Sequence, residues 1–121
     1  MSSSEYAIDG NLSRLTWNPR ALKHRGHEVY ALRLLGEIAV QGHPVEVEHA
    51  ETYYRQALVL ADELGMRPLQ AHCHAGFGTL YGRMGRREQA QAALSTAMAL
   101  YRTLDMTFWL SQAEAALTRM A

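Results

Sequence analysis

Residues 50–66 read AETYYRQALVLADELGM, and residues 90–106 read AQAALSTAMALYRTLDM. Five positions of the first stretch recur unchanged forty residues later: Ala50, Ala57, Leu60, Leu64 and Met66 return as Ala90, Ala97, Leu100, Leu104 and Met106. Upstream, Leu35-Gly36 corresponds to Phe77-Gly78 at a spacing of forty-two, and the two additional residues fall in the longer turn around residues 42–45. Self-similarity at this period predicts a protein built from repeated helical units.

The residue mix and its periodicity predict helices along most of the chain. Ala and Leu supply 34 of the 121 residues, whereas Val and Ile, which favour strands, supply seven. Apolar residues recur at steps of three and four, and glycines or prolines separate the periodic segments. The predicted helices are 19–25, 27–41, 45–64, 68–83, 87–104 and 107–120. Because linkers this short make consecutive helices antiparallel, we predict an all-α fold, an α-solenoid of antiparallel helix hairpins.

The first helical region carries two local expectations. Asn18-Pro19 is typical of a helix start, and Gly26 is typical of a helix end, so residues 19–25 are predicted to form a short helix or the end of a longer one. The helix that follows has an apolar face that we expect to point into the core, formed by Val29, Leu32, Leu35, Ile38 and Ala39.

Small residues at matching positions of the two repeats predict where helices cross closely. A larger side chain at such a crossing would overpack it. The positions are Gly36, Ala50, Ala57, Gly78, Ala90 and Ala97. We expect the rings of Tyr54 and Tyr81 to fill the gaps beside them. The run Gly76-x-Gly78-x-x-x-Gly82 is interpreted in the same way, because a phosphate-binding loop requires a preceding strand and a following Lys-Ser/Thr pair.

The repeated residues resemble the tetratricopeptide repeat, whose signature begins W-x-x-L-G-x-x-Y and continues with A-x-x-x-F and a further alanine. The second repeat matches at Phe77-Gly78, Tyr81, Ala90, Leu94 and Ala97. The first repeat matches at Leu35-Gly36, Ala50, Tyr54 and Ala57. Leu32 and His74 stand where the family often has Trp, Ala39 replaces Tyr, and the period of about 40 residues exceeds the usual 34 or so.

This resemblance covers residues 27–104 and implies a domain organisation. Residues 27–64 form the first repeat, residues 68–104 the second, and residues 107–120 the start of a third repeat or a capping helix, all within one helical domain of residues 14–121. Residues 1–13 are expected to be a flexible arm. The longer period resembles the C-terminal arrays of large bacterial regulators that join a cyclase or signalling ATPase domain to helical repeats. None of their catalytic domains lies in this chain.

The resemblance implies a concave groove that binds a protein or peptide. In the family the groove is lined by the second, fifth, ninth, twelfth and thirteenth positions of each first helix. Counting from Gly36 and Gly78 as eighth positions gives Tyr30, Arg33, Glu37, Val40 and Gln41, then His72, Ala75, Thr79, Gly82 and Arg83. The partner-binding residues that we predict are Tyr30, Arg33, Glu37, Gln41, His72, Thr79 and Arg83.

Two arginines of this set indicate what the groove binds. Arg33 and Arg83 can each hold a carboxylate through two hydrogen bonds, so an acidic peptide or an acidic C-terminus is the expected partner. His72 beside them is expected to tighten binding below about pH 6.5, its unperturbed pKa. Two alternatives stay open: an ordinary wet surface that binds nothing, and a self-assembly element that joins copies of this chain, with a homodimer as the expected state.

The remaining chemistry of the sequence favours no enzyme, metal or cofactor. His72 and His74 point about 200° apart on a helix, so His72-Cys73-His74 does not have the geometry of a tetrahedral zinc site. Cys73 is interpreted as an inert small apolar residue. Arg83, Arg86 and Arg87 cluster around a turn, where solvated side chains are expected. There is no Ser-His-Asp grouping and no nucleophile elbow.

Charge and composition exclude further classes. Twelve basic and twelve acidic residues cancel, which argues against a nucleic-acid binder that works through bulk charge. The apolar runs are no longer than five residues, too short for a membrane span or a signal peptide. A single cysteine fits a reducing compartment, and a cytoplasmic location is expected.

Overall fold

The structure is a computed structural model that describes residues 19–120. Within this range the chain forms five α-helices and no strand: α3 (Pro19–Gln41), α4 (Val47–Leu64), α5 (Arg67–Arg83), α6 (Arg87–Thr103) and α7 (Thr107–Met120). The all-α prediction is therefore confirmed for the described residues. The predicted arm, residues 1–13, lies outside them.

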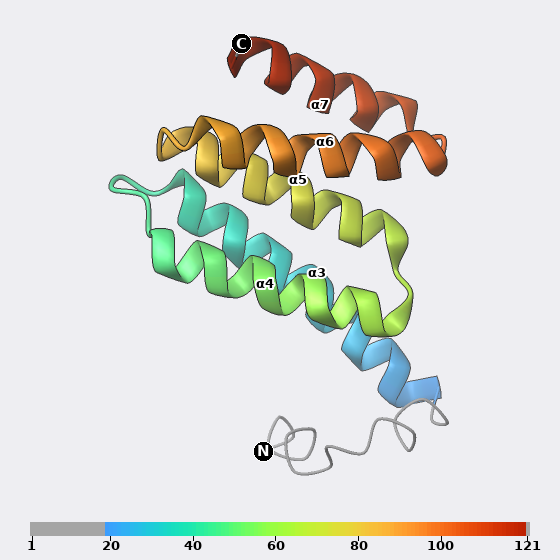
Figure 1. Ribbon diagram of the computed structural model, residues 1–121. Coiled ribbons are helices and arrows are strands. Elements are labelled where there is room, and N and C mark those ends of the chain that lie inside the picture. Colours follow the sequence, from blue (N-terminus) through green and yellow to red (C-terminus); the bar gives the residue numbers. More distant parts are fainter. Residues whose placement is uncertain (1–18, 121) are drawn as a thin grey trace.

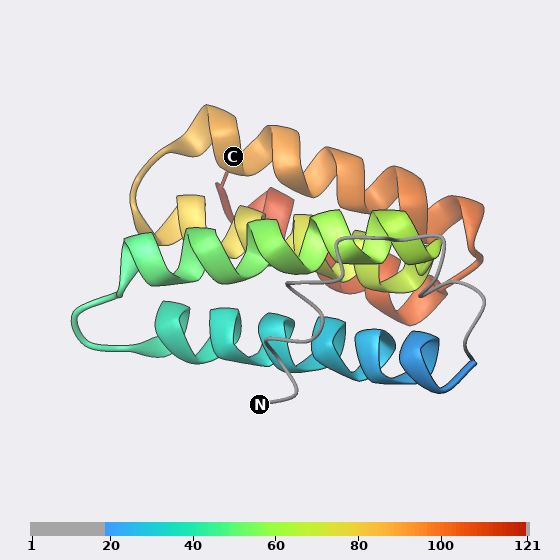
Figure 2. The same cartoon turned by 90° about the horizontal axis from the view of Figure 1, so that it is seen from below.

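The helices pack in chain order, and consecutive helices run side by side in opposite directions (Figure 1). α3 also contacts α5, and α5 also contacts α7, so these three helices form one layer. α4 and α6 lie on one side of that layer, as the view turned by 90° shows (Figure 2). The opposite side of the layer carries the candidate site.

Three of the four connections have the same geometry, spaced twenty residues apart. Gly65, Gly85 and Asp105 each adopt a left-handed conformation, with φ of 69°, 78° and 59°. The next residue donates its backbone N–H to the carbonyl five residues earlier, each time at 2.9 Å: Met66 to Ala61, Arg86 to Tyr81, and Met106 to Tyr101. These bonds satisfy carbonyls that a helix end leaves without partners. The connection from α3 to α4 is longer and different, as the offset between the repeats predicts.

The small residues lie at close helix contacts, as predicted. Ala50, Ala57, Ala90 and Ala97 are fully buried. A Cβ on Gly36 would lie 3.0 Å from the ring of Tyr54, and a Cβ on Gly78 would lie 2.6 Å from Cγ of Leu94. Tyr54 is 2% exposed and fills the gap beside Gly36, whereas Tyr81 is only partly buried, with its hydroxyl 3.4 Å from Glu51.

The prediction of a helix end at Gly26 is wrong, because α3 continues without interruption from Pro19 to Gln41. A glycine ends a helix by adopting a positive φ, as Gly65 and Gly85 do, and Gly26 is not among the glycines with positive φ. The segment is instead held against α4: Arg25 forms an ion pair with Glu63 at 2.6 Å, and Gly26 faces Met66.

The apolar face expected for this helix is also partly wrong. Val29 and Ala39 are buried, but Leu35 is 41% exposed and Ile38 is 68% exposed. α3 is the first helix described. Its neighbours α4 and α5 cover only part of its circumference. A periodic apolar stripe indicates which residues share a face, and it does not show whether a neighbouring helix covers that face.

Candidate functional site

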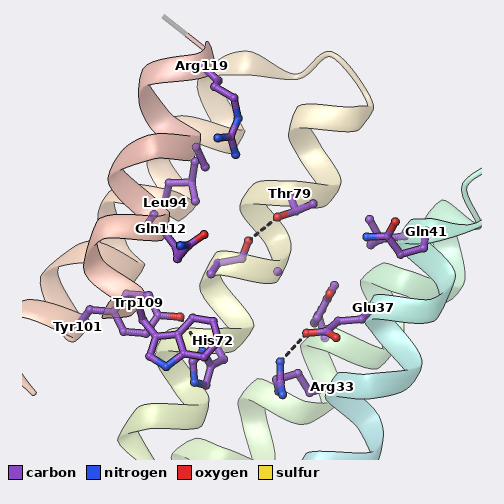
Figure 3. A pocket seen from close by; sticks show the side chains of 16 residues that line it. Arg33, Glu37, Gln41, His72, Thr79, Leu94, Tyr101, Trp109, Gln112 and Arg119 are labelled. Atoms are coloured by element: carbon purple, nitrogen blue, oxygen red, sulfur yellow. Dashed lines mark hydrogen bonds and ion pairs between the residues drawn. The ribbon is translucent and has the colours of Figure 1, made fainter. Parts of the chain in front are cut away.

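A pocket of about 400 Å³ opens between α3, α5 and α7 (Figure 3). Five of the seven predicted partner-binding residues line it: Arg33, Glu37, Gln41, His72 and Thr79. Val40 and Ala75, which the count from Gly36 and Gly78 also assigns to the groove, line the pocket as well. The helix positions deduced from the repeat therefore converge on one hollow.

Tyr30 and Arg83 do not line the pocket. Tyr30 lies on α3 with half of its surface exposed. Arg83 turns toward the end of α3, where its Nη1 donates a hydrogen bond to the carbonyl oxygen of Val40 at 2.8 Å. The last carbonyls of a helix lack internal partners, and a nearby guanidinium is well suited to satisfy one. In this structure Arg83 therefore caps α3 and does not line the pocket.

Helix α7 supplies a wall of the pocket that the sequence prediction missed. Its contributing residues are Trp109, Gln112, Ala113, Ala116 and Arg119. The signal was present in the repeat, because an offset of forty places Gln112 at the position of His72 and Arg119 at the position of Thr79. The predicted groove residues come only from the helices of the first two repeats, so the residues of α7 are absent from that prediction.

Arg33 and Glu37 form the polar wall on α3. Nη1 of Arg33 donates to Oε2 of Glu37 at 2.5 Å, and the side chain of Arg33 is 21% exposed. Its Nε is enclosed and has no hydrogen-bond partner within the described residues. Within the described residues, only one of the five N–H donors of the guanidinium therefore has a hydrogen-bond acceptor.

His72, Tyr101 and Trp109 form an aromatic wall opposite Arg33 (Figure 3). Nδ1 of His72 lies 2.7 Å from the hydroxyl of Tyr101, and its ring meets the Trp109 ring edge-on at a centroid distance of 4.8 Å. Burial, together with the charge of Arg33, lowers the pKa of His72 below its ordinary value of 6.5. His72 is therefore expected to become protonated at a pH below 6.5, the value expected from the sequence.

The floor of the pocket is made by small residues and one ring. Ala75 and Gly76 of α5 leave space in which the ring of Tyr54 lies between α3 and α5. Burial, and then the charge of Glu37, raise the pKa of Tyr54, so this phenol stays protonated at neutral pH. The floor is uncharged, and the charged groups that line the pocket are Arg33, Glu37 and Arg119.

Cys73 does not line the pocket. Cys73 is fully buried, and burial raises its pKa to about 11, which makes it the inert apolar residue that was predicted. Across residues 19–120, no three His, Cys, Asp or Glu side chains come together in an arrangement that would hold a metal ion. In the same part of the chain, no helix combines the length and apolar character needed to cross a membrane.

Comparison of the chain with protein-family models, with curated proteins and with solved structures returned no significant match.

Proposed function

We propose that this chain is a tetratricopeptide-like α-solenoid that binds an acidic peptide segment of a partner protein in the pocket between α3, α5 and α7. The observation that carries the proposal is the convergence of the repeat-derived positions on that pocket. The identical turns after α4, α5 and α6 and the contacts between alternate helices support the solenoid architecture.

The charges of the pocket support an acidic ligand. Among the described residues, two arginines and one glutamate line it, so the walls that they form carry a net positive charge while His72 is neutral. Arg33 and Arg119 lie at opposite ends of the hollow (Figure 3), which suits an extended segment with more than one acceptor group. The apolar surface of Trp109 and the adjacent alanines suits a side chain between those ends.

The test compares two double variants in a pull-down followed by peptide affinity measurements. Arg33→Ala with Arg119→Ala removes both pocket cations, whereas Arg55→Ala with Arg102→Ala removes two exposed arginines of α4 and α6 that do not line it. We expect the pocket variant to lose affinity for the recovered partner's acidic segment at least tenfold, since each charge-assisted hydrogen bond contributes about 1.5–3 kcal/mol. Equal affinity of both variants, with intact helical spectra, would refute the proposal.

A second candidate function, self-association through α3, rests on a separate observation. Tyr30, Leu34 and Ile38 recur at steps of four on α3, with exposed fractions of 50%, 50% and 68%, and Leu35 beside them is 41% exposed. Four large apolar side chains on one helix form a surface that a second copy of the chain would cover in a homodimer.

Light scattering over a range of micromolar concentrations tests this candidate. We expect the unmodified chain to form a dimer and Leu34→Gln with Ile38→Gln to be monomeric. Val59→Gln serves as the control, because Val59, at 55%, has an exposed fraction between those of Leu34 and Ile38 but lies on α4. A concentration-independent monomer mass for the unmodified chain would rule the dimer out.

A further inference from the structure

The hydrogen bond between His72 and Tyr101 can be made in two ways. Either the phenol donates its proton to Nδ1, or a protonated Nδ1 donates to the phenol oxygen. Tyr101 is 1% exposed, and the bond to His72, at 2.7 Å, is the only one that its hydroxyl forms within residues 19–120. If Nδ1 were the donor, the hydroxyl proton of Tyr101 would be left without an acceptor among the described residues, at a cost that folded proteins avoid for buried groups.

Both groups are neutral under ordinary conditions, so the direction of this bond decides where the imidazole proton lies. Burial raises the pKa of Tyr101 to about 12, so its proton is present. Burial and the charge of Arg33 lower the pKa of His72, so the ring carries a single proton. If Tyr101 donates to Nδ1, that proton must be on Nε2.

Nε2 is the ring nitrogen that remains for a ligand. His72 lines the pocket, its Nδ1 is turned to Tyr101, and Trp109 flanks the ring edge-on at an interplanar angle of 78°. Within the described residues Nε2 has no hydrogen-bond partner, and it is not among the enclosed atoms that lack one. It is therefore an accessible atom at the same end of the pocket as Arg33 (Figure 3).

We propose that Tyr101 holds His72 as the Nε2–H tautomer, so that the pocket presents a fixed neutral donor beside Arg33 and selects a ligand with a carboxylate or carbonyl oxygen at this point. This deepens the proposed function and rests on it. A donor that cannot exchange roles disfavours ammonium and guanidinium groups at this point, because both Nε2–H and Arg33 would face another donor. Tyr101 is thus a positioning residue and His72 a specificity-determining one.

The tautomer can be measured without any ligand. Long-range proton–nitrogen correlation spectra of the full ¹⁵N-labelled chain at neutral pH distinguish a protonated from an unprotonated ring nitrogen, and His72→Gln identifies the signals of His72. We expect a single tautomer, with Nε2 protonated and Nδ1 unprotonated. Tyr101→Phe removes only the hydroxyl and should give the averaged signals of a mixture of tautomers. An Nδ1–H pattern in the unmodified chain, or no change in Tyr101→Phe, would overturn the proposal.

The ligand class is tested with two probes that share a ring, N-acetyl-phenylalanine and phenethylammonium. We expect the carboxylate probe to shift the His72 Nε2–H and Trp109 indole N–H signals in a saturable way and the ammonium probe to leave them unchanged. Equal shifts with both probes, or none with the carboxylate, would contradict an acceptor-selective site. His72→Gln keeps a side-chain N–H and should retain most of the affinity for N-acetyl-phenylalanine. His72→Leu should bind this probe about tenfold more weakly, the effect of losing one hydrogen bond.

These results separate the inference from the function on which it rests. If the tautomer is wrong but the Arg33 and Arg119 double variant still loses the acidic segment, the pocket binds peptides without a fixed His72 donor. If the tautomer and the probe preference are as expected but no acidic segment depends on the two arginines, the donor is present and the peptide-binding function is refuted.

Discussion

Gly76 of α5 faces the ring of Tyr54 so closely that a Cβ on Gly76 would lie 2.4 Å from Cε1. The same ring lies against Gly36 of α3, where a Cβ would be 3.0 Å away. One tyrosine of α4 thus occupies the space that two glycines leave open on the two helices of the neighbouring layer. Because Tyr54 and Gly76 both line the pocket, this contact also sets its depth.

Replacing Gly76 with alanine should destabilise the protein. The added methyl group would overlap the ring of Tyr54, a residue that is 2% exposed, and overpacking of this kind costs about 1–3 kcal/mol. Alanine is more favourable than glycine in a helix by up to about 1 kcal/mol, which offsets part of this cost. Chemical denaturation should therefore show a net loss of up to about 2 kcal/mol in the free energy of unfolding.

Gly26→Ala is the matched control for this substitution. Gly26 is also helical, and its Cβ would meet the nearest atom, Cε of Met66, at 3.8 Å, an ordinary contact. Gly26→Ala should be neutral or stabilising by up to about 1 kcal/mol. A loss of stability no larger in Gly76→Ala than in Gly26→Ala would show that the ring of Tyr54 can move away.

The three matching turns predict substitutions of opposite sign. Asp105 holds a left-handed conformation in the turn where Gly65 and Gly85 stand in the others, so Asp105→Gly should raise the free energy of unfolding by about 0.5–1 kcal/mol. Gly65→Ala should lower it by about 1 kcal/mol through local backbone strain alone, because no atom beyond its chain neighbours lies within 4 Å of the added Cβ. Thermal or urea unfolding of both variants checks the pair. Changes of the same sign would contradict the argument.

The last four helices were predictable to within about two residues at each end, for a local physical reason. Gly65, Pro68 and Gly85 stand at turns whose backbone geometry requires or favours them, so residue type and conformation agree. Gly26 has the same residue type without that conformation, and the sequence around it offers no second signal. The exposure of Ile38 was not predictable either, because burial depends on a neighbouring helix rather than on the period.

The candidate site was predictable where the repeat fixes a position on a helix face. Arg33, Glu37 and His72 follow from that rule and line the pocket. The direction of a long side chain does not follow from it, and Arg83 reaches away to Val40. Extending the same offset of forty to α7 would have located Arg119, the second cation of the pocket.

Arg83→Ala should therefore affect stability and leave binding unchanged. It removes the bond to the carbonyl oxygen of Val40, a residue that is 1% exposed, and should cost about 1 kcal/mol in urea unfolding. Its affinity for an acidic peptide should match that of the unmodified chain. A loss of affinity as large as that of Arg119→Ala would show that Arg83 takes part in binding the peptide.

Cys73 should make the protein sensitive to alkali. Burial raises the pKa of its thiol from 9.0 to about 11, so above pH 9.0 the unfolded chain loses a proton that the folded chain retains. The free energy of unfolding should fall between about pH 9 and pH 11, by at most about 1.4 kcal/mol per pH unit for this group. In Cys73→Ala the fall should begin near pH 10, the ordinary pKa of the buried Tyr101 hydroxyl. Urea titrations of both chains would disprove this if their onsets coincide.

His72 and His74 should make the protein sensitive to acid. Burial lowers the pKa of both rings, and for His72 the charge of Arg33 on α3 adds to it, while Tyr101 on α6 and Trp109 on α7 are uncharged. As the pH falls below 6.5, the unfolded chain binds protons that the folded chain does not, so the free energy of unfolding decreases until the folded-state pKa is reached. Each ring contributes at most about 1.4 kcal/mol per pH unit. In urea titrations on both sides of pH 6.5, His72→Gln with His74→Gln should flatten this slope, whatever its effect on stability at neutral pH. An unchanged slope in the double variant would assign the acid sensitivity to other groups.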